Sequence, residues 1–276
     1  MQESNKISIT ANKVLLFGGV YSNLHALERL KQIAEAQGFL PKQIICNGDI
    51  VGYCAQPEDC LQFVKAWGIH NIIGNVEENL RGGVDDCGCD FEEGTRCDIL
   101  SRQWYPSAQN AVSQPSIEWL KTLPRYLEID FAGKKWAVVH GSPSNISEFI
   151  FNSTEWAVKE KYIEDLQVDG IIAGHSGLPF SNKRNDKYWI NPGVIGMPAN
   201  DGQTAVWYGI LTVEKAEIKV EHHAFEYDYN TANGLMKEKE LPASYAKTLR
   251  TGIWDNCDIL PEEETRNQGK KILFEK

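Results

Sequence analysis

Residues 44–49 read Ile-Ile-Cys-Asn-Gly-Asp, and this stretch decides how the rest of the sequence is interpreted. A short apolar run is typical of a buried strand, and Asn-Gly is typical of a turn. In α/β proteins the sheet fixes the backbone at the end of a strand, and the following loop presents side chains to ligands. Taken alone, Asp49 is more simply explained as a turn or helix N-cap residue.

Three later stretches repeat this pattern, in which an apolar run ends beside glycine and a possible metal ligand. They are Ile72-Ile73-Gly74-Asn75, Val138-Val139-His140-Gly141 and Ile171-Ile172-Ala173-Gly174-His175. Because ligand sites of α/β proteins lie along the carboxyl ends of the strands, we expect the four polar side chains to converge there.

The first part of the chain alternates strand and helix patterns. Strands are predicted at residues 13–18, 43–46 and 71–73, and helices at residues 23–37 and 57–67. This β-α-β-α-β order implies parallel strands with right-handed crossovers.

The middle of the chain departs from this alternation. Residues 76–97 are acidic and glycine-rich, and they predict a loop insertion. Residues 98–123 predict two helical pieces that separate at Pro115, and residues 127–131 and 135–140 predict a β-hairpin.

The last third of the chain changes to antiparallel strands. A helix is predicted at residues 154–166, capped by Ser153, and a strand at residues 170–173. Further strands are predicted at residues 187–190, 203–212 and 216–224, with hairpin turns at Asp201-Gly202 and residues 213–215. We expect one helix and a charged tail after about residue 231.

These patterns together predict an α/β protein, a four-layer αββα sandwich of two mixed β-sheets flanked by helices. Residues 1–230 would form one domain, with the insertion at 76–97, and residues 231–276 would pack on it.

The composition limits the classes of partner. The 276 residues carry a formal net charge of -10, which argues against broad binding to nucleic acid. The sequence has no apolar run long enough for a transmembrane helix and no secretory signal at its start. The seven cysteines are therefore expected to be mostly reduced, in a cytoplasmic protein.

In these strand-end stretches the sequence resembles the calcineurin-like metallophosphoesterase family, close to its small bacterial phosphodiesterase-type branch. The family has five blocks, D-x-H-G-N-L, G-D, G-N-H/C-D, H-G and G-H-x-H, usually followed by N-P-G. The matching stretches are Gly19-Val20-Tyr21-Ser22-Asn23-Leu24, Gly48-Asp49, Gly74-Asn75-Val76-Glu77, His140-Gly141, Gly174-His175-Ser176-Gly177 and Asn191-Pro192-Gly193. The resemblance spans roughly residues 13–224.

The departures from the family pattern fall into one group. Gly19 and Tyr21 replace the Asp and His of the first block, Val76 replaces the His of the third, and Gly177 replaces the last His. Of the family's first-metal ligands only Asp49 remains, so the resemblance implies half of a two-metal centre.

The family's second-metal ligands are all present. The resemblance assigns this role to Asp49, Asn75, His140 and His175. An N/O set of this kind suits one divalent transition metal, Zn²⁺, Fe²⁺ or Mn²⁺. With one carboxylate, the centre would carry a net charge of about +1, able to hold phosphate, another anion or a phosphorylated small molecule. The position of the family's first metal would be a glycine-lined gap beside Tyr21.

Catalytic roles are assigned to Tyr21, Asn75 and His140. Tyr21 has two open interpretations, a hydrogen-bond donor to a phosphate oxygen or an aromatic plug in the missing metal's volume. Glu77 would either cap the following helix or contact a bound cation.

Three cysteines, Cys87, Cys89 and Cys97, follow the Asn75 block. They could form a secondary metal or redox site, although their spacing fits no standard C-x-x-C pair, or they could be a local cluster of reduced thiols.

Three functions therefore stay open: a phosphate-ester hydrolase with an incomplete metal centre, a binding or regulatory homologue without turnover, and a redox or metal-handling protein. The family resemblance favours the hydrolase, although function must be argued from the site.

Overall fold

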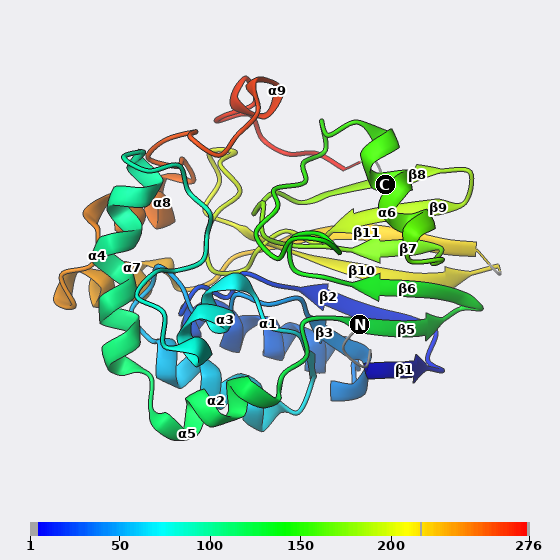
Figure 1. Cartoon of the computed structure of the whole chain (residues 1–276), viewed down its shortest axis with the longest axis horizontal. Coiled ribbons are helices and arrows are strands. Elements are labelled where there is room, and N and C mark those ends of the chain that lie inside the picture. Colours follow the sequence, from blue (N-terminus) through cyan, green and yellow to red (C-terminus); the bar gives the residue numbers. More distant parts are fainter. Residues whose placement is uncertain (1–4, 216, 275–276) are drawn as a thin grey trace.

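A computed structural model describes residues 5–215 and 217–274, and it has two β-sheets between outer layers of helices (Figure 1). The first sheet has the order β11-β10-β2-β3-β4. Its strands are β2 (Lys13–Phe17), β3 (Ile44–Cys46), β4 (His70–Asn71), β10 (Val206–Glu214) and β11 (Glu217–Phe225). Strands β2, β3 and β4 are parallel, as the alternating sequence pattern predicted, and β10 is antiparallel to both of its neighbours.

The second sheet has the order β1-β5-β6-β7-β9-β8. Its strands are β1 (Asn5–Ile9), β5 (Leu127–Phe131), β6 (Lys134–Val138), β7 (Gly170–Ile172), β8 (Phe180–Arg184) and β9 (Lys187–Asn191). The predicted hairpin is β5–β6. Strands β1 and β8 were not predicted from the sequence, because they are polar strands at the two edges and β8 has only Phe180 buried.

The two sheets bury one apolar layer between them. It joins Val14, Leu16 and Ile45 of the first sheet to Trp136 and Ile172 of the second. Apolar surface removed from water in this layer contributes about 25 cal/mol per Å² to stability.

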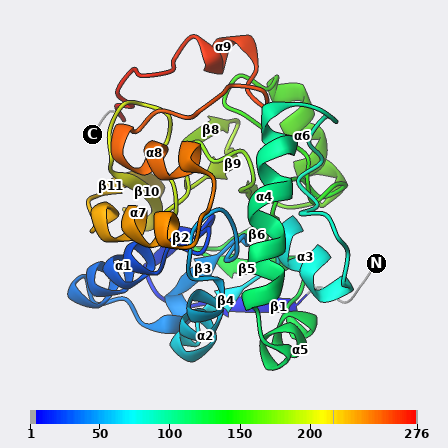
Figure 2. The same ribbon diagram turned by 90° about the vertical axis from the view of Figure 1, so that its left-hand side faces the viewer.

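The helices cover the outer faces. The first sheet is covered by helices whose apolar side chains share its outer core, and these are α1 (Leu24–Ala36), α2 (Pro57–Trp67), α3 (Asn75–Gly82), α4 (Arg96–Ala111), α5 (Gln114–Thr122), α7 (Tyr229–Glu238) and α8 (Ala243–Thr251). Helix α6 (Trp156–Asp165) packs on the second sheet. Figure 2 shows α7 between α1 and α8, with α4 in front. This is the predicted αββα sandwich.

Several local predictions were wrong. The predicted loop at residues 76–97 begins with a helix, α3 (Asn75–Gly82), and α4 begins within it. Helix α6 is preceded by Glu155 at its N-cap position, so Ser153 is not the cap. The C-terminal stretch holds α7, α8 and a short α9 (Glu262–Thr265), where one helix was expected.

The two predicted hairpin turns had different outcomes. Strands β10 and β11 form a hairpin across Lys215, although Ala216, the predicted first residue of the second strand, lies outside the described residues. Asp201-Gly202 does not join a hairpin, because β9 and β10 belong to different sheets. The connection between them crosses from one sheet to the other.

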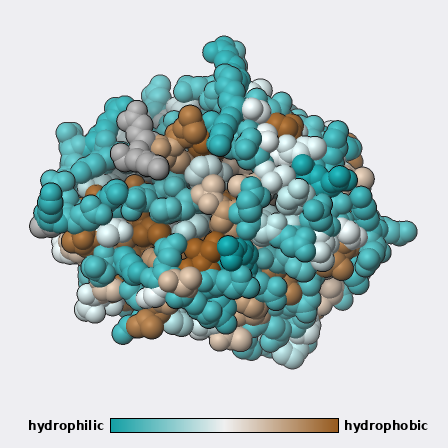
Figure 3. Space-filling model, turned by 180° about the vertical axis from the view of Figure 1, so that it is seen from behind, coloured by the Kyte–Doolittle hydropathy of each residue, from teal (hydrophilic) through white to brown (hydrophobic). Residues whose placement is uncertain are grey.

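Within the described residues, the structure contains no helix that is both long and apolar enough to cross a membrane. The face seen in Figure 3 is mostly hydrophilic, with hydrophobic residues gathered in small areas.

Candidate metal centre

The four predicted ligands come from loops at the ends of four strands. Asp49 follows β3 and Asn75 opens α3 after β4, so both belong to the first sheet. His140 follows β6 and His175 follows β7 in the second sheet. The four side chains therefore meet where the two sheets adjoin, each sheet supplying two.

The side chains converge on His140 Nε2. This nitrogen lies 3.2 Å from Asp49 Oδ2, 3.0 Å from Asn75 Oδ1 and 3.3 Å from His175 Nδ1. One possible ligand atom each of Asp49, His140 and His175 lies within 4.8 Å of the others. All four residues are buried. Far apart in sequence, these groups form one compact donor set.

The other nitrogen of His140 fixes the ring. Nδ1 lies 2.8 Å from the carbonyl oxygen of Asn47 and donates its proton there, while Asn47 Nδ2 donates to the carbonyl oxygen of Ala173, also at 2.8 Å. In the neutral ring Nε2 then presents a lone pair to the oxygens of Asp49 and Asn75. Those lone pairs repel one another unless a cation, either a proton or a metal ion, lies among them.

The pKa shifts agree with this need for a cation. Burial alone would lower the pKa of His140, but the adjacent Asp49 carboxylate raises it overall. Burial and the neighbouring His140 lower the pKa of His175 to about 3, so this imidazole is neutral, as a metal ligand must be.

Two buried atoms of the set have no hydrogen-bond partner within the described structure: Asp49 Oδ1 and His175 Nε2. Leaving a buried polar atom unpaired costs about 1–3 kcal/mol. Asp49 and His175 also have positive φ angles of 54° and 61°, which are uncommon for residues other than glycine. The atoms that face His140 are the other atom of each group, Asp49 Oδ2 and His175 Nδ1, and the positive φ angles are of the kind found at ligand sites.

Glu77 holds the two loops of the first sheet together. Its carboxylate accepts hydrogen bonds from the backbone N–H groups of Asp49 (2.9 Å), Val51 (2.8 Å) and Gly74 (2.8 Å). Burial, followed by the charge of Asp49, raises the pKa of Glu77 to about 7. Of its two predicted roles, the contacts are those of a cap on α3, which also positions Asp49.

The amide of Asn75 is oriented by the cysteine loop, residues 83–95. Asn75 Nδ2 donates to the carbonyl oxygen of Cys87 (3.1 Å) and to Cys89 Sγ (3.3 Å), so Oδ1 faces His140. This contact was not predicted from the sequence, since nothing in the local pattern indicates it. The sequence shows only that the cysteines follow the Asn75 block.

The three cysteines do not gather into a site of their own. Cys87 and Cys89 are buried beside Asn75, whereas Cys97 lies on α4 and its thiol contacts Asn256 Oδ1 at 3.3 Å. In the part of the chain that the structure describes, all seven cysteines are free thiols, and none belongs to a convergent metal-ligand group. Cys87 and Cys89 agree with the alternative of a local cluster of reduced thiols, whereas Cys97 lies apart from them on α4.

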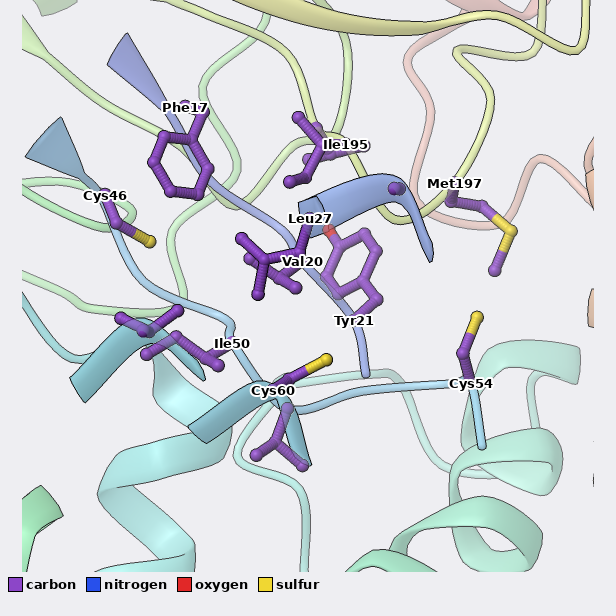
Figure 4. Close-up of a cluster of buried hydrophobic side chains, with 14 of the residues drawn as sticks. Phe17, Val20, Tyr21, Leu27, Cys46, Ile50, Cys54, Cys60, Ile195 and Met197 are labelled. Atoms are coloured by element: carbon purple, nitrogen blue, oxygen red, sulfur yellow. The ribbon is translucent and has the colours of Figure 1, made fainter. Parts of the chain in front are cut away.

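The space next to Gly19, which is part of the expected gap beside Tyr21, is filled. A Cβ atom at Gly19 would lie 2.3 Å from Val194 Cγ1 and 2.9 Å from Tyr21 Cζ. Tyr21 packs edge-on against Tyr53, with ring centroids 4.7 Å apart, and Figure 4 shows it among buried apolar side chains beside Val20. Val194 and Tyr21 therefore occupy the space at Gly19, which agrees with the interpretation of Tyr21 as an aromatic plug, while Tyr21 and Gly177 still border a small cavity that reaches Asp49.

The other altered family positions are also enclosed by apolar groups. Val76 is buried, and a Cβ atom at Gly177 would lie 3.3 Å from Trp254 Cη2. Trp254 comes from the C-terminal segment, and no local sequence pattern indicated that it would reach this loop.

Comparisons with known proteins agree with this architecture. Residues 17–216 match the family model described as the calcineurin-like phosphoesterase superfamily domain. An uncharacterized protein of Methanocaldococcus jannaschii is 26% identical over 258 residues, covering 87% of this chain and 98% of that protein. The crystal structure of a metallophosphoesterase from Sphaerobacter thermophilus has a TM-score of 0.70 and 25% identity, covering 88% of this chain and 100% of the other.

A hypothetical protein from Pyrococcus horikoshii OT3 has a similar fold. Its crystal structure gives a TM-score of 0.73 at 20% identity, and the match covers 88% of this chain and 99% of that one.

Proposed function

Since the chain belongs to the calcineurin-like phosphoesterase superfamily, we propose that it hydrolyses phosphate mono- or diesters at a centre holding a single divalent cation. The observation that carries this proposal is the convergence of Asp49, Asn75 and His175 on one nitrogen of His140, at 3.0 to 3.3 Å. A hydrolase of this class needs a place where a cation and a phosphoryl oxygen meet.

The residues at this point fit a transition metal. Asp49, Asn75, His140 and His175 offer two oxygens and two imidazole nitrogens, a donor set suited to Zn²⁺, Fe²⁺ or Mn²⁺. The proton-free Nε2 of His140, which faces oxygens of Asp49 and Asn75, supports this assignment. The packing at Gly19 argues against a second ion, because Val194 and Tyr21 occupy the space of its ligands.

A divalent cation held there would polarise a phosphoryl oxygen and lower the pKa of a water molecule. The chain's own residues would orient the reactants. Asn47 keeps the His140 ring in place, and Asn75 presents its amide oxygen beside it. Burial raises the pKa of Tyr21 well above its ordinary value, so its hydroxyl stays protonated and can donate a hydrogen bond to a phosphoryl oxygen.

The test is hydrolysis by the full-length protein loaded separately with Zn²⁺, Fe²⁺ and Mn²⁺, using an aryl phosphate and a bis-aryl phosphodiester. We expect turnover with at least one metal, and its loss in Asp49→Ala. The matched control is Asp59→Ala, which removes an exposed carboxylate on α2 and should retain full activity. Equal turnover by wild type and Asp49→Ala would refute the proposal.

One observation favours a second candidate function, a metal-dependent binding or regulatory protein without turnover. The family's third-block histidine is replaced by buried Val76, which removes a group able to stabilise charge or donate a proton. Groups of this kind contribute about 10²–10⁴-fold to rate. This candidate predicts about one metal per chain and a melting temperature raised by a phosphorylated ligand, with no product formed.

A further inference from the structure

A cavity of about 70 Å³ adjoins the candidate metal centre, reaching Asp49 and His175. A cavity needs about 10–15 Å³ to hold a single water molecule, so this cavity can take a small chemical group of several atoms. Most of its wall is apolar, and six aromatic side chains contribute to it: Tyr21, Tyr53, Phe91, Phe149, Tyr245 and Trp254.

One side of this cavity is built by the C-terminal segment, which lies beyond the part of the chain that matches the family model. Trp254 is held there by two hydrogen bonds, from its Nε1 to the carbonyl oxygen of Pro198 (2.7 Å) and from its backbone N–H to Asn200 Oδ1 (2.8 Å). Arg96 Nε contacts Asp255 Oδ2 at 2.6 Å and ties the segment to α4. The aromatic wall is therefore a fixed surface.

The charges around the cavity are few. The lining residues, all in the described part of the chain, include two carboxylates, Asp49 and Asp255, and neither lysine nor arginine. Asp255 is paired with Arg96 on its outer side. A divalent cation beside Asp49 would leave a net charge of about +1 to meet an anion.

We propose that this cavity selects a monoanionic phosphodiester that carries a small planar apolar ester group, with the ring against Trp254 and the neighbouring tyrosines. This inference rests on the proposed function, which supplies the cation at Asp49. A diester carries one negative charge and balances the centre. A monoester carries close to two at pH 7 or above, and its second charge would find no lysine or arginine among the lining residues, in a wall of low polarity.

Binding can be tested apart from turnover, because phosphinates and phosphonates have no ester bond to hydrolyse. Calorimetry at pH 8 on the metal-loaded protein would compare methylphenylphosphinate (monoanion with a ring), phenylphosphonate (dianion with a ring) and dimethylphosphinate (monoanion without a ring). We expect the first to bind at least about 10-fold more tightly than either of the others, and removal of the metal to abolish binding. Equal or tighter binding of phenylphosphonate would overturn the charge argument.

Substitutions test the aromatic wall. Trp254→Ala should weaken methylphenylphosphinate about 5- to 10-fold and leave dimethylphosphinate unchanged, whereas Trp254→Phe should retain most of the affinity. Trp119→Ala removes another half-buried tryptophan, on α5 and away from this cavity, and should change neither ligand. Equal weakening of both phosphinates by Trp254→Ala, or no weakening of either, would overturn the proposal.

If the proposed function fails but this inference holds, the protein will hydrolyse no ester and will still bind methylphenylphosphinate more tightly than the other two ligands. If Trp254→Ala does not fold, Trp254→Phe and the order of the three ligands on wild type still decide the question.

Discussion

Individual residues around the centre differ in how they act, because some supply donor atoms and others only orient them. Cys87 and Cys89 are of the second kind, because they accept hydrogen bonds from the amide nitrogen of Asn75 and so keep its amide oxygen toward His140. Contacts that orient a ligand in this way typically affect metal affinity 10- to 100-fold.

Cys89→Ala should therefore lower metal affinity about 10-fold, because the amide of Asn75 loses a hydrogen-bond partner. Cys89→Ser keeps an acceptor at the same position and should retain most of the affinity. Competition with a chromophoric chelator measures both. Cys60→Ala, which removes a buried thiol on α2, is the control for lost packing. Unchanged affinity in Cys89→Ala would show that the thiol does not position Asn75.

Gly19→Ala should destabilise the fold by about 2–4 kcal/mol, because the new methyl group would overlap Val194 at a position where φ is +51°. Gly38→Ala is a matched control with φ of +70° and nothing within 4 Å of the new atom, so it isolates the backbone cost of about 1 kcal/mol. Urea unfolding would measure both. If the two variants lose equal stability, the space beside Gly19 is open.

The sequence pattern placed the four metal-ligand residues at strand ends. The structure brings them together because their strands, two in each sheet, end where the two sheets adjoin. The contacts of Cys89 with Asn75 and of Trp254 with Gly177 were not predictable. These contacts join segments that meet only through tertiary packing, so no local residue pattern predicts them.

At the scale of elements, α6 is joined to edge strand β8 through a buried lysine. Lys159 is 1% exposed, and its ammonium group donates to the carbonyl oxygen of Asn152 (3.1 Å) and to Asn182 Oδ1 (2.6 Å). Burial lowers the pKa of Lys159 to about 8, against 10.5 for an ordinary lysine. A charge held in this way makes the attachment of α6 dependent on pH.

Between pH 8 and 10 the unfolded chain binds a proton that folded Lys159 has lost, so this group makes stability rise with pH. Relative to Lys159→Met, wild type should gain up to about 1.4 kcal/mol per pH unit in this window. Denaturant unfolding at pH 7, 8, 9 and 10 measures the difference. Lys161→Met, at an exposed position on the same helix, should show no such gain. A constant difference between wild type and Lys159→Met would rule out the shift.

Elements with strong local signals were predicted well. Helix α2 begins at Pro57, as expected from proline in a first turn, and ends before Gly68 in the left-handed conformation. Helix α3 was missed because its eight residues carry three charged side chains and two of its four buried residues are polar, which resembles a loop. Its boundaries are set by Glu77 and Gly83, whose roles appear only in the structure.

At the scale of the whole molecule, the C-terminal segment completes the outer core and one wall of the cavity. Met236 of α7 and Leu249 of α8 are fully buried in the cluster that covers the first sheet. Figure 1 shows α4 and α8 near the end of the sheets toward which β6 and β7 run. This placement supports the expectation that residues 231–276 pack on the rest of the chain.

A chain that ends at residue 228 should lose most of its stability, because it exposes the apolar groups that α7 and α8 cover. Burying one large apolar side chain contributes about 1.5–3 kcal/mol, so a few such losses equal the whole stability of a typical domain. Differential scanning calorimetry of the two chains tests this. A single sharp transition at the wild-type temperature in the shortened chain would show that residues 229–276 form a separate appendage.

The division of the four donors between the two sheets has a mechanical consequence. Asp49 and Asn75 are attached to one sheet, and His140 and His175 are attached to the other, so a relative displacement of the sheets would separate the two pairs. Any ion that binds all four acts as a clasp across the sandwich, and its affinity reports how closely the halves approach. Substitutions in the apolar layer between the sheets, for example at Trp136, should then change the affinity for the ion without touching its ligands.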